Sequence, residues 1–184
     1  MRVITGIARG KRLITVPGDD IVRPTSEKVK EALFSSIQFD IEGRRILDLF
    51  AGCGQLGIEA LSRGAKSCVF VDSNDASLNA IKKNLENTGL ANFAKTYKSD
   101  YSAFAVRCAD KFDIAFLDPP YKLGILEDAL KKTAPLMSNF GKIFCEHPID
   151  INLPDAVENF SVCKVYRYGK TAITVYKKDV AENV

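Results

Sequence analysis

The stretch RRILDLFAGCGQLGIEALSRGAKSCVFVD, residues 44–72, carries the pattern that decides the fold. It begins with a short apolar run, passes through a turn whose glycines are spaced as GxGxxG, and enters a segment with helical periodicity. A second apolar run, SCVFVD at residues 67–72, closes the stretch. A strand, a glycine turn, a helix and another strand form a βαβ unit, whose two strands lie parallel in one sheet.

The same alternation continues to residue 147. Further apolar runs lie at residues 93–100, 112–118 and 142–147, and helical segments lie at 76–90 and 125–137. This order predicts a parallel sheet with helices on both faces. The next apolar segment, residues 160–178, has no helical pattern and predicts an antiparallel hairpin around RYGK. We therefore predict an α/β, Rossmann-like fold with a mostly parallel, seven-stranded sheet and an antiparallel C-terminal hairpin.

The N-terminal segment departs from this alternation. Residues 2–16 contain two short strand-like pieces around ARGK and predict a hairpin. Residues 22–37 place apolar side chains at helical spacing, and Thr25 or Ser26 can cap that helix. We therefore expect a small hairpin-and-helix extension at residues 1–40 and a domain formed by the parallel sheet at residues 41–184.

Charge is concentrated at the start of the chain. The first twelve residues, MRVITGIARGKR, include four basic side chains and no acidic one, although the net charge of the chain is only +3. We call residues 1–16 the basic arm. Local basic charge on a nearly neutral body favours contact with a polyanion. A solvated edge hairpin is the other interpretation of the same charge.

Length and composition limit the classes of protein to consider. A chain of 184 residues with 46% apolar and 27% charged residues is typical of one globular domain with a small appendage. Five cysteines without a CxxC pair indicate reduced thiols and a cytoplasmic location. Cys145 and His147 lack further ligands at workable spacing, so we expect no metal. We see no signal peptide and no apolar run of about 18 residues, and expect neither secretion nor a membrane span.

Four of the predicted strands end in an aspartate: Asp48, Asp72, Asp100 and Asp118. In an open parallel sheet, ligands bind outside the carboxyl ends of the strands, so these acids face one predicted crevice. Structural capping would explain any one of them, but it is a weaker explanation for all four.

The glycine turn and the acids together indicate the ligand. Asp72 follows Gly52 by about 20 residues, the distance that suits a carboxylate bound to ribose hydroxyls, and the glycine pattern alone indicates NAD. Asp48, however, would repel a pyrophosphate and attract an ammonium group, and no acid or base for hydride transfer is obvious. S-adenosylmethionine has a ribose, an adenine and an ammonium group but no phosphate, so it fits this crevice better.

These motifs resemble a known family. DLFAGCGQLGIEALSRGA at residues 48–65, with LDPPY at 117–121, resembles class I S-adenosylmethionine-dependent methyltransferases that act on exocyclic amino groups. More narrowly, RVITGIARGKRL, RPTSEKVKEALF and the later GKTAITVYKK are similar to the RsmD-type 16S rRNA guanine-N2 methyltransferases. The resemblance covers nearly the whole chain in the same order. It departs at Cys53 and Gln55, where smaller residues are expected, and at Asp72, where glutamate is common.

The resemblance implies S-adenosyl-L-methionine as the cofactor. The binding residues that it implies are Asp48, Phe50, Ala51, Gly52, Gly54, Asp72, Ser73, Asp100, Tyr101 and Asp118. In this assignment Asp48 orients the ammonium group, Asp72 holds the ribose and Asp100 accepts from the adenine amino group.

The resemblance places catalysis in the motif formed by Asp118, Pro119, Pro120 and Tyr121. The Asp118 carboxylate and the Pro119 carbonyl can each accept one N–H of a guanine N2 amine, which aims its lone pair at the methyl group. The prolines remove competing N–H groups, and Tyr121 can stack on a flipped-out base. Catalysis is then mostly alignment, with Asp118 or water taking the proton.

The expected partner is 16S rRNA in the small ribosomal subunit or in its assembly intermediate, bound by a monomer. The expected RNA-binding residues are Arg2, Arg9, Lys11, Arg12, Arg23, Arg167 and Lys170, with Lys28, Lys30 and Tyr168 as further candidates.

Other functions stay open at this point. DPPY also occurs in adenine-N6 methyltransferases that act on DNA or RNA, although a DNA enzyme usually needs an added recognition domain. A methyltransferase for small-molecule or protein amines would not need the basic arm. An NAD-dependent oxidoreductase would bind NAD rather than S-adenosylmethionine. A noncatalytic RNA-binding protein would tolerate the loss of Asp118.

Overall fold

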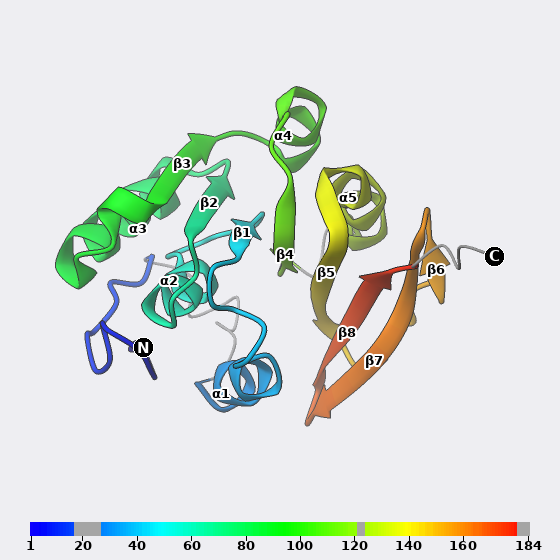
Figure 1. Ribbon diagram of the computed structural model, residues 1–184, viewed down its shortest axis with the longest axis horizontal. Coiled ribbons are helices and arrows are strands. Elements are labelled where there is room, and N and C mark those ends of the chain that lie inside the picture. The colour runs from blue at the N-terminus through cyan, green and yellow to red at the C-terminus, as the bar shows by residue number, and fades with distance from the viewer. Residues whose placement is uncertain (17–26, 121–123, 180–184) are drawn as a thin grey trace.

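The computed structural model describes residues 1–16, 27–120 and 124–179. Within them, one eight-stranded sheet has the order β3-β2-β1-β4-β5-β8-β7-β6, with helices on both sides (Figure 1). The strands are β1 (Arg45–Asp48), β2 (Ser67–Asp72), β3 (Ala94–Lys98), β4 (Phe112–Leu117), β5 (Met137–Pro148), β6 (Ala156–Val157), β7 (Phe160–Tyr168) and β8 (Thr171–Lys178). The helices are α1 (Glu27–Ser36), α2 (Gln55–Ser62), α3 (Asp75–Thr88), α4 (Tyr101–Arg107) and α5 (Leu126–Thr133).

The pairing confirms the predicted fold class. Strands β1 to β5 pair in parallel, and β8, β7 and β6 add antiparallel at the β5 edge. The predicted hairpin is β7 and β8. The sheet has one strand more than the seven predicted, because Ala156–Val157 pairs with the start of β7. A two-residue strand is too short to show the alternation that identifies strands in a sequence.

Alternate residues of the central strands enter two cores. On β1, Ile46 packs with residues of α1, α2 and α3, whereas Leu47 packs with residues of α4 and α5. Both faces of the sheet are therefore covered around its central strands, as expected of parallel strands with long apolar runs. Helix α4 was not predicted. The predicted helix at 125–137 is divided into α5 and a 3₁₀ turn, η3 (Ala134–Leu136), which contains Pro135.

The basic arm forms a tight paired loop with a single antiparallel bridge, Arg2 to Arg12, instead of two regular strands. Backbone bonds at 3.0 Å from Val3 N to Lys11 O and 2.9 Å from Gly10 N to Val3 O close it. Val3, Ala8 and Leu13 are buried in the same core as α1 and α2. The predicted caps Thr25 and Ser26 lie outside the described residues. The division at residue 40 stays a prediction.

The candidate active site at the switch point of the sheet

The order of the strands places a crevice beside β1. The chain proceeds from β1 outward through β2 to β3, and then returns to the other side of β1 for β4 and β5. Ligands of open α/β sheets bind where the strand order reverses, outside the carboxyl ends of the strands. Asp48 is in register with Phe70 on β2 and with Phe116 on β4. Asp72 and Asp118 therefore both lie two residues beyond this level, one on each side of β1.

The glycine loop begins where β1 ends. Ala51 N donates to Val71 O at 3.0 Å, and Gly54 N donates to Ala51 O at 2.7 Å. Gly54 has φ +81° and forms the N-cap of α2, a left-handed conformation that favours glycine. A Cβ at Gly57 would lie 2.3 Å from Phe70 Cε1, so α2 approaches β2 more closely than a larger residue permits. All three glycines of the pattern have a place in this turn and in the packing of its helix.

Asp48 is buried beneath this loop. Its Oδ2 accepts the Gly57 N–H at 2.9 Å. Burial raises the pKa of Asp48 to about 7, against the effect of that hydrogen bond and with a smaller contribution from the charge of Asp72. A cation bound nearby would stabilise the ionised form. The predicted partner of Asp48, an ammonium group, is such a cation.

Asp72 supports the loop with both carboxylate oxygens. Its Oδ2 accepts the Gly52 N–H and its Oδ1 accepts the Asn74 N–H, each at 2.8 Å. Aspartate in place of glutamate therefore has a structural role here, because the carboxylate bonds directly to the glycine loop. Ser73 next to it is exposed. A carboxylate has about four acceptor sites, so these two bonds leave Asp72 able to accept from a ribose.

Asp100 and Tyr101 lie at the start of α4. Asp100 Oδ1 caps the helix by accepting from Ser102 N at 2.9 Å and Ala103 N at 3.3 Å. The Tyr101 hydroxyl donates to Asp128 Oδ2 at 2.7 Å, and this bond raises the pKa of Tyr101 to about 12. The ring of Tyr101 lies 5.5 Å from that of Phe50, centroid to centroid. Two predicted cofactor residues, from the loop after β1 and from α4, thus form one aromatic contact.

One buried polar atom in the loop is unpartnered. Among the described residues, Gln55 Oε1 is the buried side-chain oxygen or nitrogen without a hydrogen-bond partner. Such atoms are rare in folded proteins because they lose water without replacing it. Gln55 is the first residue of α2 and one of the departures from the family pattern. An acceptor at this position suits a ligand that brings N–H or O–H donors, as S-adenosylmethionine does.

The predicted catalytic motif follows β4. Asp118 is half-buried, Pro119 is buried and Pro120 is exposed. The neighbouring backbone is tied to the loop after β1, because Leu49 N donates to Phe116 O at 3.1 Å. Tyr121 lies outside the described residues.

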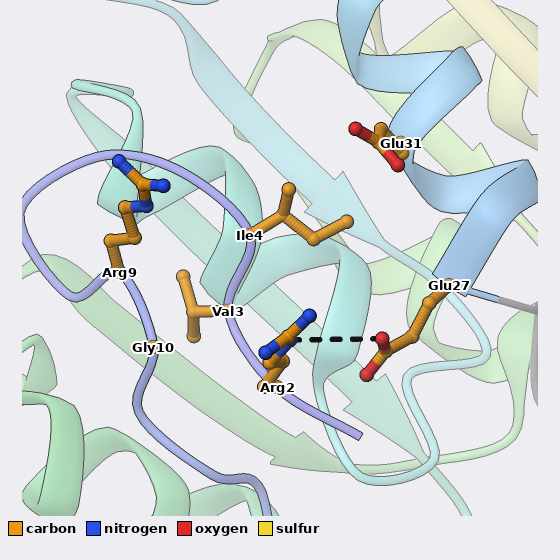
Figure 2. A pocket seen from close by; sticks show the side chains of 7 residues that line it. All are labelled: Arg2, Val3, Ile4, Arg9, Gly10, Glu27 and Glu31. Atoms are coloured by element: carbon orange, nitrogen blue, oxygen red, sulfur yellow. Dashed lines mark ion pairs between the residues drawn. The ribbon is translucent and has the colours of Figure 1, made fainter.

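The basic residues fall into two regions, the arm and the end of β7 with the turn after it. Figure 2 shows Arg2 and Arg9 at a cavity of about 250 Å³ that is also lined by Glu27 and Glu31 of α1. The Arg2 guanidinium faces Glu27, with Nε 3.7 Å from Oε2. Lys11 and Arg12 are exposed. Arg23 lies outside the described residues.

The turn of the arm does not lie beside the glycine loop. The Ile7 N–H donates to Ser62 O at 2.8 Å, and a Cβ at Gly6 would lie 1.8 Å from that oxygen. Ser62 is the last residue of α2, whereas the glycine loop precedes its first residue. A helix of this length places its two ends about 12 Å apart.

Arg167 lies near the end of β7 and Lys170 in the turn between β7 and β8, and both are exposed. Thr171 pairs with Pro148 at the end of β5, and Ile149 N donates to Lys170 O at 3.0 Å. This turn therefore lies at the carboxyl edge, on the same side of the sheet as the aspartates. Tyr166 and Tyr168 of β7 have nearly parallel rings, 6.3 Å apart at 9°.

The structure contradicts Lys30 as an RNA ligand. Its side chain is 0% exposed, its Nζ donates to Arg2 O at 2.7 Å, and Glu59 Oε2 lies 3.6 Å away. Burial lowers the pKa of Lys30, although Glu59 opposes this effect. Lys30 therefore fixes the arm in place and does not reach solvent.

Sequence reasoning missed the polar residues that hold the arm. Glu59 accepts from Ile4 N at 2.8 Å and Thr5 N at 3.0 Å, while Ser62 Oγ donates to Thr5 O at 2.6 Å. Asn84 on α3 binds Ile14. The available signal is that Glu59 and Ser62 stand among apolar residues of α2, because a polar residue on a buried helix requires a partner.

The single histidine has a structural environment. His147 is buried, with Nδ1 2.8 Å from Pro148 O and Nε2 2.8 Å from Thr174 Oγ1. Within the described part of the chain, no group of three or more His, Cys, Asp or Glu side chains could hold a metal ion. None of the helices described is long and apolar enough to cross a membrane.

The chain is similar to known proteins over most of its length. The family model described as "Conserved hypothetical protein 95" matches residues 1–177. The chain is 40% identical to the "Putative rRNA methyltransferase YlbH" of Bacillus subtilis, covering 97% of this chain and 99% of that one. It is 30% identical to "Ribosomal RNA small subunit methyltransferase D" of Escherichia coli, covering 97% and 90%. The solved structure of "Putative methyltransferase yhhF from Escherichia coli" superposes with a TM-score of 0.86 at 30% identity, covering 97% and 98%.

Proposed function

Because this chain belongs to the conserved hypothetical protein 95 family, we propose that it is an S-adenosyl-L-methionine-dependent methyltransferase of ribosomal RNA. Its substrate is the exocyclic N2 amine of a guanine in 16S rRNA, in the small ribosomal subunit or an assembly intermediate. The observation that carries this proposal is the placement of Asp72 and Asp118 on either side of β1, at the switch point of the sheet.

The residues around the glycine loop fit the cofactor. Asp48 meets the ammonium group, directly or through water, and Asp72 binds the ribose while it holds Gly52 N–H. Asp100 receives the adenine amino group with the carboxylate that caps α4. Phe50, Ala51, Gly52, Gly54, Ser73 and Tyr101 complete the proposed site. S-adenosyl-L-methionine, when bound, supplies an electrophilic methyl group on its sulfonium sulfur.

Asp118 and Pro119 orient the amine. The Asp118 carboxylate and the Pro119 carbonyl each accept one N–H, which draws the nitrogen toward tetrahedral geometry and leaves its lone pair free to accept the methyl group. Asp118 or water then takes the proton that the amine releases. Pro120 contributes no competing N–H, and Tyr121 stacks on the base. Correct positioning supplies most of the rate enhancement.

The two basic regions support a long RNA footprint. Arg167 and Lys170 contact RNA next to the amine site, because the end of β7 and the turn after it lie at the carboxyl edge. Arg2, Arg9, Lys11 and Arg12 contact RNA farther away, along α2. Arg23 is a further RNA-binding residue in this proposal. In this division residues 1–40 dock the RNA and residues 41–184 bind the cofactor. The protein acts as a monomer in the cytoplasm.

The test uses purified protein, methyl-labelled S-adenosylmethionine and small-subunit particles from cells that lack this protein. The RNA is digested to nucleosides and the labelled nucleoside is identified. We expect label in N2-methylguanosine. Label in N6-methyladenosine would retain the reaction class and replace the base, whereas an unlabelled RNA would reject the substrate.

A further inference from the structure

A buried amide joins the glycine loop to the basic arm. Asn84 of α3 is 0% exposed. Its Nδ2 donates to Cys53 O at 2.9 Å, in the glycine loop, and to Ile14 O at 2.9 Å, in the arm. Its Oδ1 accepts the Ile14 N–H at 2.7 Å. One planar group therefore fixes the backbone of both segments, and neither can move relative to it without losing a buried hydrogen bond.

Cys53 contacts the arm with its side chain as well. It forms a small buried cluster with Val16 of the arm and Ala80 of α3. Its Sγ lies 3.9 Å from Met1 Sδ. Cys53 stands between Gly52 and Gly54, so the proposed cofactor loop meets the arm directly. This contact gives a structural meaning to one of the departures from the family pattern.

The other attachments of the arm avoid the loop. Glu59 and Ser62 bind the backbone of residues 4–8, toward the end of α2 that is distant from the glycine loop. Like Asn84, they hold the backbone of the arm, but their hydrogen bonds do not reach residues 50–54. Glu59 and Ser62 therefore attach the arm only to α2, whereas Asn84 attaches it to the glycine loop as well.

We propose that Asn84 is a positioning residue that couples cofactor binding to RNA binding. This inference rests on the proposed function for its two ligands. A cofactor that orders the glycine loop fixes the Cys53 carbonyl, the Asn84 amide and hence the backbone of the arm at Ile14. RNA then binds an arm that is already ordered and loses less conformational entropy. By linkage, RNA must strengthen cofactor binding by the same factor.

The experiment measures the affinity of small-subunit particles for the protein with and without saturating S-adenosylhomocysteine. For the wild type we expect binding to become about 5-fold tighter or more, a typical size for coupled sites. Asn84→Ala should reduce this ratio to about 1. Ser62→Ala is the matched control, because it loosens the arm without touching the loop; it should weaken RNA binding and keep the ratio.

If the wild type binds both ligands but neither ligand changes the affinity for the other, the coupling is overturned and the proposed function stays intact. If S-adenosylhomocysteine does not bind, the proposed function fails with it. If the ratio of the two particle affinities is the same in Asn84→Ala as in the wild type, Asn84 is not the link.

Hydrogen exchange provides a second readout that does not depend on the folding of a variant. S-adenosylhomocysteine should slow exchange of the Ile14 amide in the wild type. An unchanged rate would also refute the proposal.

Discussion

At the scale of single residues, the role proposed for Asp118 predicts that its loss affects catalysis and not cofactor binding. We expect Asp118→Ala to lower the rate constant of methyl transfer by about 100-fold or more, a loss typical of a group that stabilises the transition state. The affinity for S-adenosylhomocysteine and the unfolding transition should stay near wild type. Single-turnover kinetics and calorimetry measure the two effects.

Asp110→Ala is the matched control for this substitution. Asp110 is exposed and lies before β4, away from the carboxyl edge. It should keep full activity. Normal turnover by Asp118→Ala would refute the proposed alignment of the amine.

The proposed contact of Asp48 with the ammonium group predicts that cofactor binding depends on pH. Its pKa of about 7 means that much of it is protonated in the free protein below that pH. A bound ammonium group lowers this pKa, so binding releases a proton at acidic pH, and affinity rises as the pH increases toward about 7. Calorimetry in buffers of different ionisation enthalpy should detect this release near pH 6.

Asp48→Asn cannot titrate, so its binding should release no proton. Only the ionisation of the ligand's own amino group, at a pKa of about 8, should then affect its affinity. Equal proton release in both proteins would show that another group responds to the ligand.

At the scale of elements, Gly57 sets the distance between α2 and β2. A methyl group there would collide with Phe70, and overpacking of this kind costs about 1–3 kcal/mol. Because Gly57 N–H also binds Asp48, we expect Gly57→Ala to weaken S-adenosylhomocysteine binding as well as stability. Urea unfolding and calorimetry measure both.

Gly10→Ala gives the comparison. Gly10 has φ +81° and nothing within 4 Å of a Cβ, so alanine there strains only the backbone. It should reduce stability and leave cofactor affinity unchanged. Similar cofactor affinities in both variants would argue against a role for the α2–β2 spacing.

The attachment of the arm to α2 depends on a buried charge. Glu59 lies between Lys30 and Arg63, with Arg63 Nε 2.8 Å from Oε1. Removing one partner of a buried ion pair typically costs about 3–5 kcal/mol, since it leaves the other charge uncompensated. We expect Glu59→Gln to lose stability of this order in urea unfolding. Lys30→Met should lose less, because Glu59 keeps Arg63.

Glu31→Gln provides the exposed control on α1 and should change stability by less than about 0.5 kcal/mol. If Glu59→Gln unfolds like this control, the network contributes no net stability to the arm.

For the whole molecule, the proposed footprint predicts two separable RNA contacts. One double variant replaces Arg9 and Lys11 by alanine, and the other replaces Arg167 and Lys170. In each variant, the slope of log K for RNA binding against log salt concentration should become shallower by about 0.7 per lost phosphate contact. The two losses should add, because the regions share no partner. Lys131→Ala on α5, which packs on the other face of the sheet, should leave the slope unchanged. Filter binding across salt concentrations measures all three.

The parallel core was predictable because its central strands are largely apolar, as FDIAFL on β4 is. The glycine turn and the acids at the strand ends were also predictable, because their spacing lies within short stretches of the sequence. Helix α4 was missed because seven residues give barely two turns of periodicity. Lys30 was misjudged because its burial depends on Glu59 and on the Arg2 carbonyl, which are distant in sequence.

The bonds between the arm and the helices also set an order of events during synthesis. The Ile4 N–H cannot form its hydrogen bond until Glu59, 55 residues later, has been synthesised. The bond of the Ile14 N–H likewise requires Asn84, 70 residues later. At about 5–20 residues per second, translation needs several seconds to supply these partners. The most basic part of the nascent chain therefore remains unpaired on the ribosome, among ribosomal RNA, until α3 has been made. An N-terminal fusion partner would remain next to this open segment throughout that interval.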